Sequence, residues 1–237
     1  MKTLFISDLH LDDSRPDTTA QLIRLLQTEA RKAAALYILG DLFEYWLGDD
    51  TPGKCGQQVA AALADLNARG VACFFMHGNR DFLLGEDYAQ SAGLTLLPQP
   101  FVIDLYGEPV LLLHGDSLCT NDVEYQQFRK RVRDPAWQAE FLAKPARERR
   151  QLALQARAGS TRHMDHSDED IMDVNQAEVV AEFVRHGVSK MIHGHTHRPT
   201  TQTFSINGTV AHRYVLGDWY RQMSVLRVQA GCYQLSP

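Results

Sequence analysis

The sequence predicts an α/β fold with parallel strands at its centre and antiparallel strands added near the C-terminus. Three observations predict it. Short apolar runs, each bounded by glycine or polar residues, are typical of buried strands. Helical patterns lie between the first of these runs, and a hairpin signal follows the last of them.

Five apolar runs predict the central strands. They are TLFIS (3–7), ALYIL (35–39), VACFFM (71–76), PVLLL (109–113) and KMI (190–192). The first helix is predicted over residues 17–33, with Asp17 as its N-cap and apolar residues at the spacing of one helix face. A second helix is predicted over residues 56–69 and ends before Gly70.

The pattern changes after residue 197. Asn207 and Gly208 lie between two strand-like runs, which is a strong signal for a β-hairpin. A further strand is predicted over residues 224–229. We expect these antiparallel strands to close a second sheet.

The composition is that of an ordinary globular protein. The chain has 237 residues, of which 44% are hydrophobic and 22% charged, so we expect one large domain with a sizeable core. The net charge of −5 gives no overall attraction to nucleic acid. The N-terminus reaches a charged residue too early for a signal peptide, and no run approaches the ~18–20 apolar residues of a membrane span.

The cysteines are scattered without a CxxC pair, which argues against a disulfide framework and against a thiolate zinc site. We expect reduced thiols in a cytoplasm. The cysteines are Cys55, Cys73, Cys119 and Cys232.

One segment differs in charge from the rest of the chain. Residues 129–162 contain ten of the 24 Lys and Arg and only three acidic residues, so this segment carries +7 and the remainder −12. Apolar residues are interleaved in a helical pattern, and we interpret residues from about 122 to 168 as an inserted helical segment. It is either a solvated helical face or a lid that receives an anionic, apolar or membrane-associated ligand.

Polar residues follow each of the five predicted strands. Because ligands bind beyond the carboxyl ends of the strands in an open α/β sheet, we expect these residues to meet at one site. Any one of them alone is more often a turn or a helix cap, but five sets at five strand ends are poorly explained by coincidence. The sets are Asp8 and His10; Asp41; Asn79, Arg80 and Asp81; His114 and Asp116; and His195 and His197.

The residue types in these sets point to metal chemistry. Carboxylates, an amide oxygen and imidazoles, without cysteine, suit Mn, Fe or Zn. Seven candidates are too many ligands for one ion but suit two ions that share a carboxylate. Two ions ~3.5–4 Å apart can clamp a phosphoryl group and lower the pKa of a bridging water. The candidates are Asp8, His10, Asp41, Asn79, His114, His195 and His197.

The motifs DxH, GD, GN, H and GHxH, in this order from residue 8 to residue 197, resemble the calcineurin-like metallophosphoesterases. The resemblance implies a sandwich of two mixed β-sheets flanked by helices, with an inserted helical lid and two metal ions. It assigns one ion to Asp8, His10, Asp41 and His197, and the other to Asp41, Asn79, His114 and His195. Asp41 would bridge the two ions, whereas His193 matches no ligand position and is expected to pack or to support a ligand.

The chain departs from the common GNH[DE] motif of that superfamily, because Arg80 stands in the place of the histidine. Arginine cannot act as a general acid, but its guanidinium can hold phosphate oxygens in a fork. This favours a pyrophosphate substrate, whose leaving group is itself a phosphate, over an alkyl phosphate ester. The structural alternative is an Arg80 side chain paired with Asp81. We expect Asp81 and Asp116 to orient metal ligands.

Several longer motifs narrow the resemblance to the UDP-2,3-diacylglucosamine hydrolase family. They are GNRDF, LLHGDSLCTND, IHGHTHRP, IMDVN (171–175) and VLGDW (215–219). The resemblance implies hydrolysis of UDP-2,3-diacylglucosamine to UMP and 2,3-diacylglucosamine 1-phosphate (lipid X) in lipid A biosynthesis, usually with Mn²⁺. The inserted segment would be a lid over the acyl chains.

The expected mechanism is attack of a metal-bridging hydroxide on the uridine-side phosphate. The expected catalytic residues are Arg80, Asp41, Asn79 and His195. By resemblance, the substrate is contacted by Asn79, Arg80, Asp122, Tyr125, Arg157, Ser160 and His195. Met164 and Ser167 align where many relatives carry Asn and Lys, a departure that affects substrate contacts but no metal ligand.

The expected location is the cytoplasm, peripheral on the anionic cytoplasmic face of the inner membrane. We expect no nucleic-acid partner and no obligate protein partner. Two alternatives remain open. One is another dinuclear phosphodiesterase acting on nucleotides or cyclic nucleotides, which Arg80 and the insertion disfavour. The other is a non-catalytic scaffold, which the presence of all seven candidate ligands disfavours.

Overall fold

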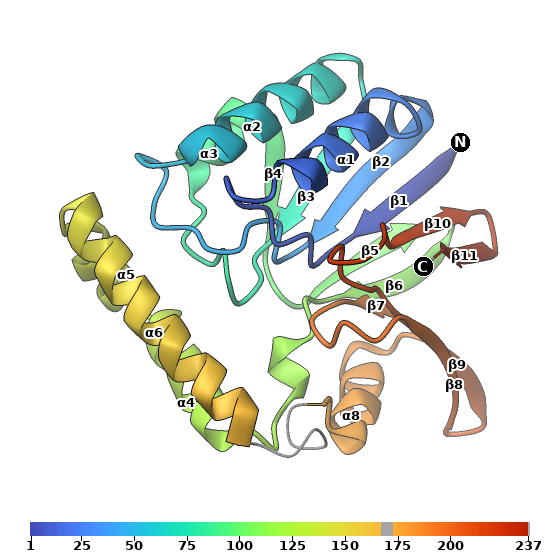
Figure 1. Cartoon of the computed structure of the whole chain (residues 1–237). Helices are drawn as coiled ribbons and strands as arrows, with labels where there is room; N and C mark the ends of the chain where they lie inside the picture. The colour runs from blue at the N-terminus through green and yellow to red at the C-terminus, as the bar shows by residue number, and fades with distance from the viewer. Residues whose placement is uncertain (167–172, 237) are drawn as a thin grey trace.

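The computed structural model describes residues 1–166 and 173–236, and it describes side chains within this range except those of residues 157–166. The described residues form two mixed β-sheets that pack face to face (Figure 1). The strand order is β11-β10-β1-β2-β3-β4 in the first sheet and β5-β6-β7-β9-β8 in the second. Parallel strands lie at the centre of both sheets, so the predicted fold class is confirmed.

The strands have the following bounds. In the first sheet they are β1 (Lys2–Ile6), β2 (Ala33–Leu39), β3 (Ala72–Met76), β4 (Leu94–Leu97), β10 (Val225–Gln229) and β11 (Cys232–Ser236). In the second sheet they are β5 (Phe101–Leu105), β6 (Glu108–Leu112), β7 (Lys190–His193), β8 (Thr200–Ile206) and β9 (Thr209–Val215).

Helices cover the outer faces of both sheets. The helices α1 (Pro16–Gln27), α2 (Gly53–Ala68) and α3 (Glu86–Ala92) pack on the first sheet, and α8 (Gln176–His186) packs on the second. The helices α4 (Val123–Val132), α5 (Pro135–Leu142) and α6 (Ala146–His166), called the lid helices below, stand beside the sandwich. Figure 1 shows them on the side toward which β1, β2 and β3 run.

Two-sided burial explains the continuous apolar runs of the central strands. In β1, Leu4 and Ile6 pack with the helices, whereas Phe5 faces the core between the sheets. In β7, Met191 packs with α8 and Ile192 faces the core between the sheets. A strand with both faces covered needs apolar side chains at every position rather than at alternate ones.

The predicted helix over residues 17–33 is too long, and its predicted cap is wrong. Helix α1 ends at Gln27, a 3₁₀ turn follows over Ala30–Lys32, and β2 already begins at Ala33. The N-cap position is Arg15, and Pro16 is the first helical residue, where its missing N–H costs no hydrogen bond. Asp17 therefore lies inside the first turn, where its charge is favourable to the helix dipole.

The prediction that the C-terminal strands close a second sheet is wrong for the last of them. The hairpin β8–β9, with Asn207 and Gly208 at its turn, does join the second sheet. Strand β10, however, pairs antiparallel with β1 in the first sheet, and β11 pairs with β10. Its Leu226 and Val228 then complete the core between the sheets. This pairing also covers the edge that β1 would otherwise leave with unpaired backbone groups.

The sequence patterns missed α3, β4 and β5, which are short elements between the third and fourth predicted strands. No helix in the described ranges is long and apolar enough to cross a membrane.

The cysteines are free thiols, and only Cys232 is exposed.

The lid helices are docked on the body rather than fully solvated. In α5, Trp137 stacks on Phe141 with ring centroids 5.1 Å apart, and it also contacts Phe82 of the body at 6.3 Å. In α6, the buried Arg149 donates hydrogen bonds to the Leu47 carbonyl and to the Asp50 carboxylate. A buried guanidinium requires such partners, so Arg149 fixes the start of α6 to the loop that follows β2.

Candidate metal centre

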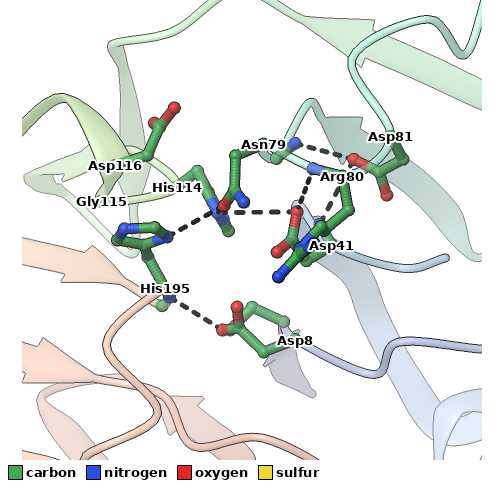
Figure 2. Close-up of polar contacts among 12 residues, drawn as sticks. Asp8, Asp41, Asn79, Arg80, Asp81, His114, Gly115, Asp116 and His195 are labelled. Carbon is green, nitrogen blue, oxygen red and sulfur yellow. Dashed lines mark hydrogen bonds and ion pairs between the residues drawn. The ribbon is translucent and has the colours of Figure 1, made fainter. Parts of the chain in front are cut away.

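The loops that follow β1, β2, β3, β6 and β7 meet at one place. Figure 2 shows Asp8, Asp41, Asn79, His114 and His195 directed toward a common centre from these different loops. The sheet topology brings them together because the carboxyl ends of the parallel strands lie at the same end of the sandwich.

The first group of candidate ligands consists of Asp8, His10 and His197, whose ligand atoms all lie within 4.8 Å of one another. The Nε2 atoms of His10 and His197 are 3.1 Å apart. Asp8 Oδ1 lies 3.5 Å from His197 Nε2. We call this set the first metal group.

The second metal group consists of Asp8, Asp41 and His114, again with ligand atoms within 4.8 Å of one another. Asn79 extends it, because Asn79 Oδ1 lies 2.9 Å from His114 Nε2 and 2.9 Å from His195 Nδ1. The four imidazoles are thus divided between two neighbouring groups.

Asp41 lies between the two groups. Its Oδ2 is 3.8 Å from His10 Nε2, and its Oδ1 is 3.7 Å from His114 Nε2. One carboxylate oxygen therefore faces each group, which is the arrangement that a bridging ligand requires.

The backbone around the centre is tightly folded. Several candidate ligands have positive φ, a conformation uncommon for residues other than glycine: Asp8 (56°), His10 (51°), Asp41 (51°), His195 (71°) and His197 (55°). Glycines allow the loops to approach one another. A Cβ atom on Gly194 would lie 2.2 Å from Asp8 Oδ2, and one on Gly78 would lie 2.1 Å from Asp41 Oδ1.

The arrangement of donors and acceptors at the centre suits bound cations. His114 Nδ1 lies 2.8 Å from the Leu39 carbonyl oxygen, which can only accept, so Nδ1 carries the proton. In neutral His114 the Nε2 lone pair then faces the carbonyl oxygen of Asn79. Asp8 Oδ2 accepts hydrogen bonds from Ser7 Oγ and the His195 N–H, whereas the buried Asp8 Oδ1 has no hydrogen-bond partner in the described residues. Lone pairs that face one another in this way suit a bound cation.

Burial and mutual charge shift the pKa values of these groups. Burial alone would raise the pKa of Asp8, but the neighbouring imidazoles of His197 and His114 hold it well below its usual range. Burial alone would lower the pKa of His114, but the Asp41 and Asp8 carboxylates outweigh it and raise that pKa. For His195, burial and the charge of His114 lower the pKa to about 3, so its imidazole is neutral and able to bind a metal.

Asp81 holds two of the loops together. It is fully buried and accepts hydrogen bonds from the backbone N–H groups of Gly78 (2.8 Å), Leu42 (2.7 Å), Phe43 (3.3 Å) and Asp41 (3.3 Å). Burial and the charge of Asp41 raise the pKa of Asp81 to about 6. Asp81 therefore fixes the loop of Asp41 against the loop of Asn79.

Asp116 joins the centre to the lid. This fully buried carboxylate accepts hydrogen bonds from Arg129 Nε (2.7 Å) and Tyr125 Oη (2.9 Å) of α4, and from Gln99 Nε2 (3.0 Å). Burial would raise the pKa of Asp116, but the charges of His114 and Arg129 hold it well below its usual range. Helix α4 thus rests directly on the loop that carries His114.

Hydrogen bonds of its own backbone hold Arg80 in place, and its side chain is not paired with Asp81. Its N–H donates to Asp41 Oδ1 at 2.8 Å, and its carbonyl accepts from the Trp46 N–H at 3.1 Å. The Asp81 oxygens are taken by backbone N–H groups, and the buried Arg80 Nε has no hydrogen-bond partner in the described part of the chain. This geometry opposes the structural alternative and leaves a cationic donor for an anion.

Comparison with known proteins identifies the family. The family model described as calcineurin-like phosphoesterase matches residues 1–199. A protein named UDP-2,3-diacylglucosamine hydrolase in Stenotrophomonas maltophilia K279a is 56% identical to this chain, and the match covers 99% of this chain and 98% of that protein. A protein of the same name in Xanthomonas oryzae PXO99A is 55% identical, and the match covers 97% of this chain and 96% of that protein. The chain belongs to the UDP-2,3-diacylglucosamine hydrolase family of the calcineurin-like phosphoesterases.

The fold of a solved archaeal phosphodiesterase is also similar. It superposes with a TM-score of 0.52 over 100% of this chain and 99% of that chain, at 12% sequence identity. At this identity the likeness concerns the fold alone. It agrees with the sandwich of two mixed sheets found here.

Two of the substrate contacts expected for the UDP-2,3-diacylglucosamine hydrolase family lie where the lid meets the centre. Asp122 caps α4 by accepting from the Tyr125 N–H at 2.9 Å. The centroids of the Tyr125 and His195 rings lie 6.2 Å apart, with an angle of 27° between the ring planes. The side chains of Arg157, Ser160, Met164 and Ser167 lie outside the described residues.

His193 belongs to neither metal group. It is buried, and its Nδ1 lies 2.9 Å from the Gly194 carbonyl oxygen.

Sequence reasoning missed three residues behind the first metal group. Glu44 Oε2 lies 3.4 Å from His10 Nδ1, Asp218 Oδ2 lies 3.7 Å from His197 Nδ1, and the Tyr220 ring stacks on His10. The sequence carries only weak signals for the two acidic residues. Glu44 closes the GDLFE run, and Asp218 lies within VLGDW, but neither position follows a central strand directly.

A cavity of about 360 Å³ separates the start of α6 from the body. Ala146, Arg147 and Arg150 line it from the lid, and Leu11 and Tyr45 are among the residues that line it from the body. The body loops that border it are those that carry His10 and Asp41. The lid therefore leaves space beside the loops that follow β1 and β2.

Replacing Asp116 tests the link between the lid and the centre. Asp116→Asn should lower the free energy of unfolding by about 2–3 kcal/mol, because hydrogen bonds from a half-buried arginine to a charged group are lost. It should also weaken metal binding or turnover ~10–100-fold, the usual cost of losing a group that orients a metal loop. Denaturant unfolding and metal titration measure the two effects.

The control is Asp65→Asn, which removes an exposed carboxylate that is also paired with arginines. It should leave the free energy of unfolding and metal binding nearly unchanged, because an exposed ion pair is screened by water. Equal, small effects for the two variants would contradict the role given to Asp116.

Proposed function

We propose that the chain hydrolyses UDP-2,3-diacylglucosamine to UMP and 2,3-diacylglucosamine 1-phosphate. The observation that carries this proposal is a centre of two metal groups that share Asp8, in which the Asp41 oxygens face His10 and His114 and the Arg80 guanidinium lies beside them. Two metal groups suit phosphoryl transfer, and a free cationic fork suits a substrate with a second phosphate. The names of relatives 56% identical to this chain support the substrate.

We assign one ion to Asp8, His10, Asp41 and His197, and the other to Asp41, Asn79, His114 and His195. The oxygen and imidazole donors, with no cysteine in either group, suit a borderline-hard ion, and we propose Mn²⁺. Such ions supply charge neutralisation at the phosphoryl oxygens and a water of lowered pKa. Asp81 and Asp116 keep the ligand loops in place for both ions.

Arg80 is proposed to bind the diphosphate and to stabilise charge on the leaving phosphate. Attack of water on the uridine-side phosphorus breaks its bond to the bridging oxygen, and that oxygen leaves with the lipid-linked phosphate. The leaving group needs charge stabilisation more than a proton, and arginine supplies that from a fixed position. Hydrolysis in ¹⁸O-labelled water should place the label in UMP.

We propose a single domain over residues 1–237, with the lid at about 122–168 closing over the acyl chains. The lid helices support this role because they are docked on the body next to the centre and border a cavity. The proposed substrate contacts are Asn79, Arg80, Asp122, Tyr125, Arg157, Ser160, Met164, Ser167 and His195.

The outer surface of the lid supports a peripheral position on the anionic cytoplasmic face of the inner membrane. The exposed basic residues of the lid that do not line the cavity are Lys130 and Arg131. Its exposed apolar residues are Val123, Phe128, Leu142, Leu152 and Leu154. Basic residues attract anionic lipid head groups, and exposed apolar side chains can enter the interface.

The substrate assay tests the proposed reaction. With Mn²⁺, the protein should release UMP from UDP-2,3-diacylglucosamine much faster than from UDP-glucose, which lacks acyl chains for the lid. His10→Ala and His114→Ala should abolish turnover without unfolding the protein, whereas His186→Ala on α8 should retain it. Hydrolysis of an aryl phosphate with no preference for the lipid would instead indicate a general phosphoesterase.

Arg80 variants test the preference for a diphosphate. Arg80→Ala should lower kcat on the UDP-linked lipid ~10²–10³-fold, the usual cost of losing a donor that stabilises transition-state charge. The loss on an aryl phosphate should be smaller, because its leaving group is not a phosphate. Arg80→His should shift the ratio of the two activities toward the ester. An equal loss on both substrates would contradict the role given to Arg80.

Charge reversal tests the membrane surface. The double variant Lys130→Glu and Arg131→Glu should sediment with anionic vesicles at least about 10-fold less than the unaltered protein, since each basic residue near the surface contributes about 1 kcal/mol. The control Arg24→Glu and Lys32→Glu changes the net charge equally, on α1 and the 3₁₀ turn that follows it, and should bind as the unaltered protein does. Equal binding of both variants would contradict the lid as the membrane-facing surface.

A further inference from the structure

The segment between β9 and β10 contains the VLGDW motif, to which the proposed chemistry gives no role. Three consecutive residues of this segment each contact a different member of the first metal group. Asp218 Oδ2 lies 3.7 Å from His197 Nδ1. The Trp219 N–H donates to the Asp8 carbonyl at 3.1 Å. The Tyr220 ring stacks on the His10 ring, with centroids 5.2 Å apart and planes within 9°.

Glu44 completes the contacts around His10. Its Oε2 lies 3.4 Å from His10 Nδ1 and accepts a hydrogen bond from the Tyr220 hydroxyl at 3.2 Å. Glu44 is only 6% exposed, so this carboxylate is held where water competes little. The imidazole of His10 is thus held at one edge by Glu44 and on one face by Tyr220.

Arg15 holds this segment to the loop of His10. Its guanidinium carbon lies 4.5 Å from the centroid of the Tyr220 ring. One guanidinium nitrogen donates to the His10 carbonyl at 3.2 Å, and the other donates to the Trp219 carbonyl at 3.5 Å. The segment and the ligand loop are therefore fixed to each other through backbone and ring contacts.

We propose that Glu44, Asp218 and Tyr220 are positioning residues that direct the Nε2 atoms of His10 and His197 at one ion. A carboxylate near Nδ1, as at 3.4 Å from His10 and 3.7 Å from His197, favours the tautomer with the proton on Nδ1 and the lone pair on Nε2. The Nε2 atoms of His10 and His197 do face each other across 3.1 Å. This inference rests on the proposed metal centre.

The second metal group is held differently. His114 Nδ1 is held by the backbone carbonyl of Leu39, and His195 presents Nδ1 to Asn79 rather than Nε2. A substitution at Glu44, Asp218 or Tyr220 leaves these contacts in place. The inference therefore predicts that only one of the two ions is affected by such a substitution.

Titration of the metal-free full-length protein with Mn²⁺, followed by calorimetry, tests this. The unaltered protein should bind two ions. Glu44→Ala should weaken one of them ~10–100-fold and leave the other unchanged, with smaller effects for Glu44→Gln, which retains an acceptor oxygen, and for Tyr220→Phe. Turnover should fall at limiting Mn²⁺ and recover at saturating Mn²⁺, with KM unchanged.

Two matched controls come from the same chain. Glu182, 8% exposed on α8, lies near His186 Nε2 at 3.1 Å, so Glu182→Ala removes a similarly buried carboxylate beside a histidine. Tyr233→Phe removes a hydroxyl that contacts a glutamate, Glu108, at 3.5 Å. Neither control should change the affinity for Mn²⁺, although either can lower the thermal midpoint of the metal-free protein.

The outcomes separate this inference from the metal centre itself. Two ions bound with unchanged affinity in Glu44→Ala and Glu44→Gln would overturn the inference and leave the centre standing. Equal weakening of both ions, or the same weakening in Glu182→Ala, would assign Glu44 a merely structural role. An unaltered protein that binds no Mn²⁺ would overturn the centre and the inference together.

Discussion

The burial of carboxylates at the ends of the central strands is the constraint on which the rest of the structure depends. In the described part of the chain, Asp8, Asp41, Asp81 and Asp116 are each 2% exposed or less. A buried charge is tolerated only when hydrogen bonds or opposite charges compensate it. Asp81 is compensated by backbone N–H groups and Asp116 by α4, whereas Asp8 and Asp41 direct oxygens at the imidazoles.

This constraint explains features that are otherwise unrelated. Positive φ angles at Asp8, Asp41 and several histidines turn their side chains into one small volume directly after each strand. Gly78 and Gly194 are needed because neighbouring carboxylates occupy the space of a side chain there. The loops can pack this tightly only because sheets with parallel central strands deliver them to the same end of the sandwich.

The lid depends on the same loops. Arg129 of α4 donates a hydrogen bond to Asp116, and Arg133, the C-cap residue of α4, donates to the Gly78 carbonyl at 2.8 Å, so this helix and its cap contact two of the ligand-bearing loops. In α6, Arg149 holds the loop that continues from Asp41. The positive charge of the insertion therefore has two separate parts. Some arginines turn inward and fix the lid, and others remain exposed.

The candidate ligands could be predicted from the sequence because each is a local signal, a polar residue directly after a short apolar run. The second-sheet hairpin was predicted for the same reason, since Asn207-Gly208 specifies its own turn. The end of α1 and the place of β10 could not be predicted locally. They depend on contacts with strands that are distant in the sequence. Strand β10 pairs with β1, and this pairing follows from how the whole sandwich packs.

By itself, the sequence determined which candidate ligands follow the central strands and in what order, because strand periodicity and glycine placement act over a few residues. Only the tertiary structure decided how those residues are held. Glu44 and Tyr220 meet across 176 positions of the chain, and Arg149 reaches Leu47 across 102. Contacts at such separations follow from how the sheets and the lid pack, and no short sequence pattern encodes that packing.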